Sequence, residues 1–204
     1  MFIVFEGIDG CGKGTQIWKF ANYLSSLSKY NHILMTREPY KFREIREILR
    51  LPEKPEEKSE KLTKLFVEDR KEHITKFITP SIEKGIIVIC DRYKYSTICY
   101  QAAQGQEINM LIDLHKNLPA PDIVFVIDVP VKTAINRMKK DSIRNPEQKF
   151  EKSSDFLEKV RQNYLKLPEL LPEEKIIIIN GDKTAEEVFE QIKNSFNSNA
   201  FPRI

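Results

Sequence analysis

The stretch GIDGCGKGT at residues 7–15 decides the fold, because it stands between the apolar run 2–5 and a helix-like segment that begins near Thr15. The spacing Gly-x4-Gly-Lys between a strand and a helix is the pattern of a phosphate-binding loop. Its glycines let backbone N–H groups approach an anion closely, and the first turn of the helix adds partial positive charge. The alternative is a glycine-rich turn before an ordinary helix. The predicted nucleotide-binding residues are Gly7, Gly10, Cys11, Gly12, Lys13, Gly14 and Thr15.

One position departs from the usual pattern of such loops. The Ser or Thr that normally follows the lysine and ligates Mg²⁺ is Gly14 here, and Thr15 comes after it. The GKGT form resembles that of adenylate kinases. We therefore expect Mg²⁺ as the cofactor, held mostly by phosphate oxygens and water with the help of a carboxylate elsewhere in the chain.

Length and composition fit one domain covering residues 1–204, with 41% hydrophobic residues. The net charge of only +3 gives no strong case for a nucleic-acid or membrane partner. Cys11, Cys90 and Cys99 are an odd number without metal-site spacing, as in reduced thiols of an intracellular protein. Neither a leader pattern nor a spanning segment is indicated, so the expected location is the cytoplasm.

Five apolar runs rich in β-branched residues predict an α/β fold. Helix-like stretches separate them, a pattern typical of a parallel sheet covered on both faces. In such sheets ligands gather at the carboxyl ends of the strands, where Gly7, Arg37, Asp91 and Asp128 fall. The runs are 2–5, 33–35, 86–90, 123–129 and 176–179.

Two further segments have a distinctive pattern. A long helix is predicted over about 60–84, with an apolar stripe that serves the core or a subunit interface. The stripe consists of Leu62, Leu65, Phe66, Ile74, Phe77 and Ile78. The polar, basic stretch over about 137–152 is poor in apolar residues and predicts a mobile loop or lid.

Charged residues follow two of the apolar runs. Asp91 and Arg92 come at the end of the third run, opposite the phosphate loop, where they could hold Mg²⁺ and a phosphate respectively. A surface ion pair at the end of a strand is the alternative. Arg37, after the second run, points where an anion would lie, which is a weak signal by itself.

Together these segments resemble the thymidylate kinases, P-loop nucleoside monophosphate kinases, over almost the whole chain. The resemblance implies a three-layer P-loop NTPase fold with a five-stranded parallel sheet flanked by helices and a short lid. It also implies an enzyme that transfers the γ-phosphate of ATP to dTMP to give dTDP for dTTP synthesis, with Mg²⁺, as a homodimer. The matching segments are FEGIDGCGKGTQ at 5–16, TREP at 36–39, LFVEDR at 65–70, DRYKYSTICYQ at 91–101 and PDIVFVIDV at 121–129.

The resemblance assigns the phosphate-handling residues. Lys13 serves the ATP phosphates, while Arg37 and Arg92 grip the acceptor phosphate. Asp91 lies near the metal, directly or through water. Asp9 contacts the sugar 3′-hydroxyl and is a second candidate for the metal region. Since the acceptor phosphate is largely a dianion at neutral pH, no general base is needed.

The resemblance also assigns the base and sugar contacts. Phe66 and Arg70 lie four apart, on one face of the predicted helix. The aromatic ring would stack on thymine and Arg70 would donate to a base carbonyl; core packing is the alternative for Phe66. Tyr100 would crowd the sugar 2′-position and so favour deoxyribose. The residues expected at the base edge are Ser96, Thr97 and Gln101.

The lid is where the chain departs from its relatives. Bacterial members often carry an Asp-Arg pair here, and this chain has the segment 148–151, QKFE, instead. Arg137, Arg144 and Lys149 are the cationic candidates for the transferring phosphoryl group, with Arg144 preferred because a lysine cannot make a bidentate contact. A solvated basic loop is the alternative. The predicted catalytic residues are Lys13, Asp91, Arg92 and Arg144, and the histidines, His32, His73 and His115, are expected to be structural.

Three rival functions stay open on the residues. The first is a kinase for another monophosphate, such as UMP, CMP or AMP, or for a deoxynucleoside. The second is a GTPase-type switch, which the lack of an Asn-Lys-x-Asp sequence disfavours. The third is a family member that binds nucleotide without catalysis, which Lys13, Asp91 and Arg92 argue against.

Overall fold

The apolar runs form one parallel sheet in the computed structural model, which describes residues 1–50, 59–140 and 154–199. The strand order is β2-β3-β1-β4-β5, and all four neighbouring pairs are parallel. The predicted α/β fold with a five-stranded parallel sheet flanked by helices is therefore confirmed. The strands are β1 (Phe2–Glu6), β2 (Ile33–Arg37), β3 (Ile87–Asp91), β4 (Ile123–Asp128) and β5 (Ile176–Asn180).

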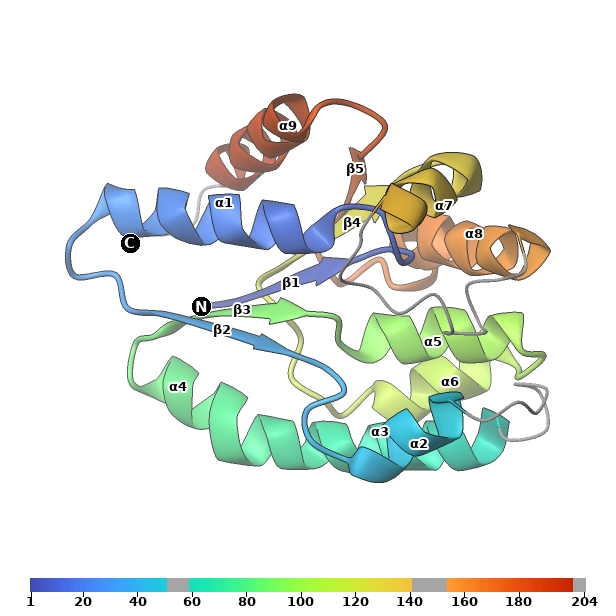
Figure 1. Ribbon diagram of the computed structural model, residues 1–204. Helices are drawn as coiled ribbons and strands as arrows, with labels where there is room; N and C mark the ends of the chain where they lie inside the picture. The colour runs from blue at the N-terminus through green and yellow to red at the C-terminus, as the bar shows by residue number, and fades with distance from the viewer. Residues whose placement is uncertain (51–58, 141–153, 200–204) are drawn as a thin grey trace.

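Helices cover both faces of the sheet (Figure 1). Helices α1 and α9 pack together on one face, and α3, α5 and α8 form a row on the other. The helices are α1 (Lys13–Leu27), α2 (Arg43–Arg50), α3 (Ser59–His73), α4 (Thr79–Glu83), α5 (Lys94–Ala103), α6 (Ile108–His115), α7 (Val131–Lys140), α8 (Ser154–Leu170) and α9 (Ala185–Ser198), with a π-helical turn, η2 (Ile74–Ile78), between α3 and α4.

The core lies on both sides of the central strands. All five residues of β1 are buried, as expected for a strand covered on both faces. Under α1 and α9, Phe20 makes edge-to-face contacts with Phe5, Phe125 and Phe196, with ring centroids 5.1–5.8 Å apart. At the start of α9, Thr184 and Glu187 form a capping box, an arrangement that contributes about 1 kcal/mol.

The helix expected over 60–84 is interrupted in the structure. Helix α3 runs into the π-helical turn η2, where Thr79 N–H bonds to Ile74 O, and α4 follows with Pro80 in its first turn. Proline has no N–H, and its ring would collide with the carbonyl four residues earlier, so a wider turn accommodates it. The direction of the helix is kept, but its hydrogen-bond pattern changes.

The expected lid starts inside a helix. Arg137 lies in the last turn of α7, which continues to Lys140, so the first residues of the expected lid, about 137–152, are helical. Residues 141–152 of the expected lid, including Arg144 and Lys149, lie outside the described residues.

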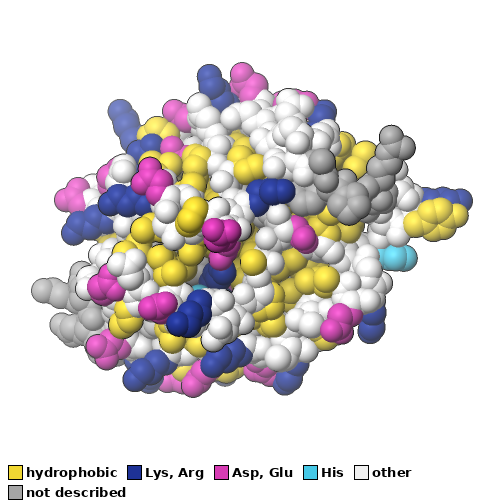
Figure 2. Space-filling model, turned by 180° about the vertical axis from the view of Figure 1, so that it is seen from behind, with side chains coloured by type: hydrophobic (Ala, Val, Ile, Leu, Met, Phe, Trp, Pro, Cys, Tyr) yellow, Lys and Arg dark blue, Asp and Glu magenta, His cyan; other side chains and the backbone are white. Residues whose placement is uncertain are grey.

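The surface carries both signs of charge. Figure 2 shows Lys and Arg side chains interspersed with Asp and Glu over one face, in keeping with a net charge of +3. Within the described residues, no helix is long and apolar enough to cross a bilayer.

Candidate active site

The loop between β1 and α1 is packed tightly against the strand and helix behind it. Gly7 and Gly10 have positive φ values of 134° and 80°. A Cβ atom at Gly7 would lie 2.5 Å from Ile127 O, and one at Gly10 would collide with Ala134 O in α7. Only glycine fits these two positions, which places the loop at the carboxyl ends of β1 and β4.

Lys13, the first residue of α1, folds back over this loop. Its ammonium group donates to Gly7 O at 2.9 Å and to Ile8 O at 3.1 Å, and it lies 3.6 Å from Cys11 Sγ. The side chain is buried. A positive charge is thus held at the centre of the loop, next to the N-terminus of α1, so the loop suits an anion.

Arg137 reaches the same loop from α7. Its guanidinium donates to Cys11 O at 3.2 Å and to Gly181 O at 3.0 Å. It therefore joins the phosphate loop to the segment that follows β5. Of the three cationic candidates for the lid, it is the one that the structure describes.

Arg92 follows β3 and faces the loop. Its guanidinium donates to Asp9 Oδ1 at 2.6 Å and to Ser96 Oγ at 3.0 Å. Burial disfavours its charge, yet Asp9, the neighbouring tyrosines and Asp91 raise the pKa of Arg92 well above its ordinary value. Its backbone has φ of 73°, a left-handed conformation that is unfavourable for a residue with a side chain. A permanently charged donor is therefore held next to Asp9 of the loop.

Asp91 pairs with the second arginine. Arg37 Nη2 donates to Asp91 Oδ2 at 3.1 Å, and the Arg37 side chain is 74% exposed. The other oxygen, Asp91 Oδ1, is buried and has no hydrogen-bond partner among the described residues. An unsatisfied buried carboxylate oxygen indicates a site for a cation or a water molecule.

Glu6 lies buried between these groups and was not predicted. It accepts hydrogen bonds from Tyr93 N at 2.7 Å, Ser96 Oγ at 2.6 Å and Tyr164 Oη at 2.8 Å. Burial raises the pKa of Glu6, and the charge of Arg92 with these hydrogen bonds opposes the rise. Because Ser96 Oγ also accepts from Arg92 Nη1, Glu6 helps to hold the Arg92 guanidinium in place through Ser96.

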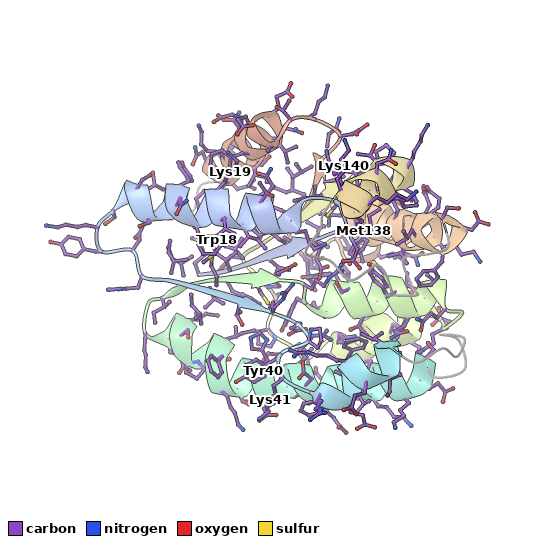
Figure 3. The ribbon with its side chains drawn as sticks, viewed as in Figure 1. Trp18, Lys19, Tyr40, Lys41, Met138 and Lys140 are labelled. Atoms are coloured by element: carbon purple, nitrogen blue, oxygen red, sulfur yellow. The ribbon has the colours of Figure 1, made fainter. Side chains whose placement is uncertain are left out.

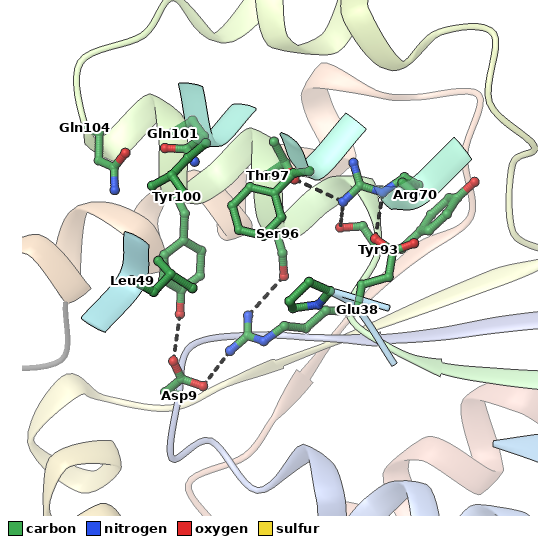
Figure 4. Close-up of a pocket in the computed structure, with 14 residues that line it drawn as sticks. Asp9, Glu38, Leu49, Arg70, Tyr93, Ser96, Thr97, Tyr100, Gln101 and Gln104 are labelled. Carbon is green, nitrogen blue, oxygen red and sulfur yellow. Dashed lines mark hydrogen bonds and ion pairs between the residues drawn. The ribbon is translucent and has the colours of Figure 1, made fainter. Parts of the chain in front are cut away.

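A cavity of about 160 Å³ opens beside Arg92, between α3 and α5 (Figure 4). Tyr100 of α5 donates to Asp9 Oδ2 at 3.4 Å at one end. Burial, Asp9 and Cys11 raise the pKa of Tyr100, opposed by Arg92, so its hydroxyl is neutral. Phe66 of α3 is half-buried in the wall. The cavity thus combines an apolar wall with a charged mouth.

Arg70 forms the inner end of the cavity, where it is almost wholly buried. Its Nε donates to Glu38 Oε2 at 2.7 Å, and its Nη1 lies 2.8 Å from His115 Nε2. Its Nη2 donates to Thr97 Oγ1 at 3.0 Å and to Tyr93 O at 3.2 Å. Four protein groups therefore fix the guanidinium.

The loop after β2 is tied to α3 behind this end. Asp69 accepts from the backbone N–H groups of Tyr40, Lys41 and Phe42 at 2.5–2.9 Å. Tyr40 stacks on His73, with ring centroids 4.7 Å apart; Figure 3 shows Tyr40 and Lys41 beside α3. These contacts hold Glu38 in place.

Known proteins match this chain over nearly its full length. The family model for thymidylate kinase matches residues 5–192. The chain is 40% identical to a probable thymidylate kinase of Thermococcus kodakarensis, over 94% of this chain and 95% of that protein. It is 36% identical to the thymidylate kinase of Fervidobacterium nodosum, over 97% and 99%, and 39% identical to that of Thermosipho melanesiensis, over 95% and 96%.

The chain belongs to the thymidylate kinase family. The predicted family membership is thereby confirmed, and the kinase class of the enzyme with it.

The structure brings most of the site residues predicted from the family together. Those that line the cavity are Asp9, Phe66, Arg70, Arg92, Ser96, Thr97, Tyr100 and Gln101. Arg37 lies outside the cavity lining, on the edge strand β2. Asp128 also lies at a strand end. Its Oδ1 accepts from Arg161 Nε of α8 at 2.6 Å, and its Oδ2 accepts from Arg161 Nη2 at 2.9 Å.

Several residues that shape this thymidylate kinase site were missed in the sequence. Glu6 and Glu38 stand inside the segments that carry the family resemblance, so those segments offered a signal for them. Tyr164 and His115 gave none, because they lie far along the chain and only the fold brings them to Glu6 and Arg70. The histidines His73 and His115 are buried and hydrogen-bonded, whereas His32 is exposed.

The residues present fit a divalent cation held mainly by a nucleotide. The described part of the chain contains no group of three or more His, Cys, Asp or Glu that could hold a metal by itself. The unsatisfied Asp91 Oδ1, at the end of β3 beside β1, could supply one hard oxygen ligand. The three cysteines are buried and free of disulfides.

Proposed function

We propose that the cavity between α3 and α5 is the dTMP site of this thymidylate kinase, which phosphorylates dTMP to dTDP. The observation that carries the proposal is the cavity lining: it includes eight of the nine residues expected to bind the substrate, all except Arg37. The cavity opens toward the phosphate loop through Asp9 and Arg92, which would let an acceptor phosphate meet a donor phosphate.

The inner end of the cavity would read the base. Phe66 offers an aromatic face for stacking, and Arg70 offers an N–H to a carbonyl of thymine. Thr97 and Gln101 lie along α5 on the same side, where they would meet the base edge. A pyrimidine that carries a carbonyl group therefore suits this end.

The middle of the cavity would hold the sugar. Tyr100 contacts Asp9 across this region, so a ribose 2′-hydroxyl would compete for space with the ring. Asp9 can accept a hydrogen bond from the sugar 3′-hydroxyl. These two residues would favour a deoxynucleotide.

The mouth of the cavity would hold the acceptor phosphate. Arg92 and Arg37 would exchange their carboxylate partners, Asp9 and Asp91, for the dianion. The acceptor is already nucleophilic, so the work of the site is to offset repulsion between two anions and to align them in line. Arg92 therefore stabilises charge in the transition state.

The phosphate loop would bind ATP, the proposed donor, through Gly7, Gly10, Cys11, Gly12, Lys13, Gly14 and Thr15. On anion binding, Lys13 would leave the loop carbonyls for the outer phosphates. Mg²⁺, when bound, supplies positive charge between the phosphates, with Asp91 as its protein ligand, directly or through water, and Asp9 as the second candidate. Arg144 is the proposed cation for the transferring phosphoryl group.

The remaining expectations are proposals about the whole protein. We infer a single domain over residues 1–204, a homodimer and a cytoplasmic location. Exposed apolar side chains on α6, Met110 and Leu114, and Phe77 of η2 support a subunit interface. Sedimentation at micromolar concentration tests the dimer, and a monomer would overturn it.

A substrate panel tests the proposed site. The purified chain is assayed with ATP and Mg²⁺ against dTMP, dUMP, UMP, CMP, AMP and GMP, and the products are resolved directly. We expect strong preference for dTMP. Preference for a ribonucleotide would overturn the assignments of Phe66, Arg70 and Tyr100.

A further inference from the structure

His115 is buried at the C-terminus of α6 and meets Arg70 behind the cavity. It is 1% exposed, and its Nε2 lies 2.8 Å from Arg70 Nη1. On the other side of the ring, Nδ1 lies 2.7 Å from Leu111 O. Since a guanidinium only donates and a carbonyl only accepts, both neighbours fix the tautomer: Nδ1 carries the proton and Nε2 accepts from Arg70.

The charges around His115 keep it neutral. Burial is the main cause that lowers its pKa, and Arg70 and Lys94 of α5 lower it further, while the hydrogen bond to Leu111 O opposes the shift. A second proton would have to lie at Nε2, directly opposite the N–H groups of Arg70. The ring therefore remains an acceptor at neutral pH.

Among the described residues, the contacts of Arg70 leave one of its N–H groups for a ligand. A guanidinium has five N–H groups. Glu38 takes Nε–H, Tyr93 O and Thr97 Oγ1 take the two on Nη2, and His115 takes one on Nη1. Since Arg70 lines the cavity, the second N–H of Nη1 is the group available to a base carbonyl.

The position of that donor depends on His115. Glu38 anchors Nε, while Thr97 Oγ1 of α5 and the carbonyl of Tyr93, directly before α5, anchor Nη2. His115 is the group that binds Nη1, the nitrogen left to meet a ligand. Without an acceptor there, Nη1 would have a buried N–H left unsatisfied, and any rotation of the planar guanidinium that relieved this loss would also move the N–H available to a ligand.

We propose that His115 is a positioning residue for base recognition, which holds Arg70 Nη1 so that it selects a pyrimidine with a carbonyl rather than an amino group at C4. The inference rests on the proposed role of Arg70 at the base. No direct contact between His115 and the substrate is involved.

Two variants separate this role from a packing role. His115→Gln places an amide oxygen near the position of Nε2 and keeps the acceptor for Arg70. His115→Asn reaches only as far as Nδ1, so it keeps a donor for Leu111 O and removes that acceptor. Both replace the ring by a smaller amide, which makes them a matched pair for polarity.

The measurement compares two ligands at saturating ATP and Mg²⁺: the KM for dTMP and the inhibition constant of 5-methyl-dCMP, which has an amino group at C4. We expect His115→Asn to raise the KM for dTMP about tenfold, the effect of one misplaced hydrogen bond. The inhibition constant should change less than about threefold, and kcat should be unchanged. His115→Gln should resemble the wild-type protein in all three constants.

Different outcomes test the role of His115 and the role of Arg70 separately. Equal losses for both ligands in His115→Asn, equal losses in the two variants, or no loss at all would overturn the role of His115. Arg70→Lys is the arm that tests the underlying site, since a lysine cannot reproduce the fixed fork. If Arg70→Lys leaves the ratio of the two constants at the wild-type value, the role of Arg70 is wrong. Thermal unfolding of each variant shows whether it is folded.

Discussion

The two ends of the cavity hold their arginines in opposite ways. At the inner end, which we propose binds the base and call the base end, Arg70 and Glu38 form an ion pair whose side chains are only 2% and 4% exposed. At the phosphate end, Arg92 and Asp9 are 16% and 25% exposed, and Arg37 and Asp91 are 74% and 17% exposed. Solvent access therefore increases from the base toward the site of phosphoryl transfer.

This difference follows from what each end must do. In a buried ion pair, separating the two side chains costs much free energy, because each charge would be left unpaired in a medium of low dielectric. Such a pair keeps Arg70 in a fixed position, which suits the recognition of a neutral base. A partly exposed pair loses little when water or a phosphate replaces the carboxylate. The phosphate end can therefore exchange its carboxylates for a dianion while the base end keeps its contacts.

The largest difference between the two ends is expected in folding stability. Glu38→Gln removes the charge that compensates buried Arg70, and we expect the free energy of unfolding to fall by about 3 kcal/mol. Arg37→Gln also removes an ion pair, but an exposed one, and should cost less than about 1 kcal/mol. Urea denaturation of both variants at neutral pH measures this. Equal losses would remove the distinction between the two ends.

The next effect is on turnover at the phosphate end. Arg92→Ala removes a charge that we propose stabilises the transferring phosphoryl group, and kcat should fall about a hundredfold or more. Arg92→Lys keeps the charge but loses the fork, so it should fall between the alanine variant and the wild-type protein. Initial rates at saturating dTMP and ATP measure both. Near-normal turnover in folded Arg92→Ala would contradict the assignment.

A third effect concerns binding at the base end. Phe66→Ala removes the proposed stacking surface, and the KM for dTMP should rise about tenfold with kcat changed far less. Phe66→Tyr keeps an aromatic face and serves as the control. If the KM for dTMP is the same in Phe66→Ala as in the wild-type protein, Phe66 packs in the wall without contacting the base.

The smallest effect is a pH dependence at the base end. The pKa of His115 is about 3 in the folded protein, against 6.5 for an exposed histidine, so the folded state favours the neutral ring. This contribution to stability is complete above pH 6.5 and is lost as the pH falls toward 3. Between pH 7 and 5.5 we expect the wild-type protein to lose about 1 kcal/mol more than His115→Gln.

Urea denaturation of the two proteins at both pH values isolates this effect. Other titrating groups, such as Glu6, whose raised pKa acts in the opposite direction, are common to both proteins and cancel in the comparison. An equal loss in wild-type protein and variant would show that His115 is not kept neutral by the fold.

The sequence predicted the sheet and the phosphate loop well because both are local signals. Strand runs and the Gly-x4-Gly-Lys spacing lie within a few consecutive residues. Two buried supports could not be predicted in the same way: His115, which contacts Arg70, and Tyr164, which contacts Arg92, lie on α6 and α8, and only the fold brings them to the site. The π-helical turn before Pro80 was also missed, because an apolar stripe does not distinguish i→i−4 from i→i−5 hydrogen bonds.

The absence of a side chain at Gly10 has a mechanical consequence. The backbone of the phosphate loop lies directly against Ala134 O, and Arg137 of the same helix clasps Cys11 O. Loop and helix are therefore in contact at two points: through the guanidinium of Arg137 at Cys11 O, and at Gly10 with no side chain of the loop between the two backbones. A displacement of α7 by even a fraction of an ångström would be transmitted to the loop. The phosphate loop and α7 thus move together, so a shift at the C-terminal end of α7, near Lys140, would reach the residues proposed to bind the nucleotide.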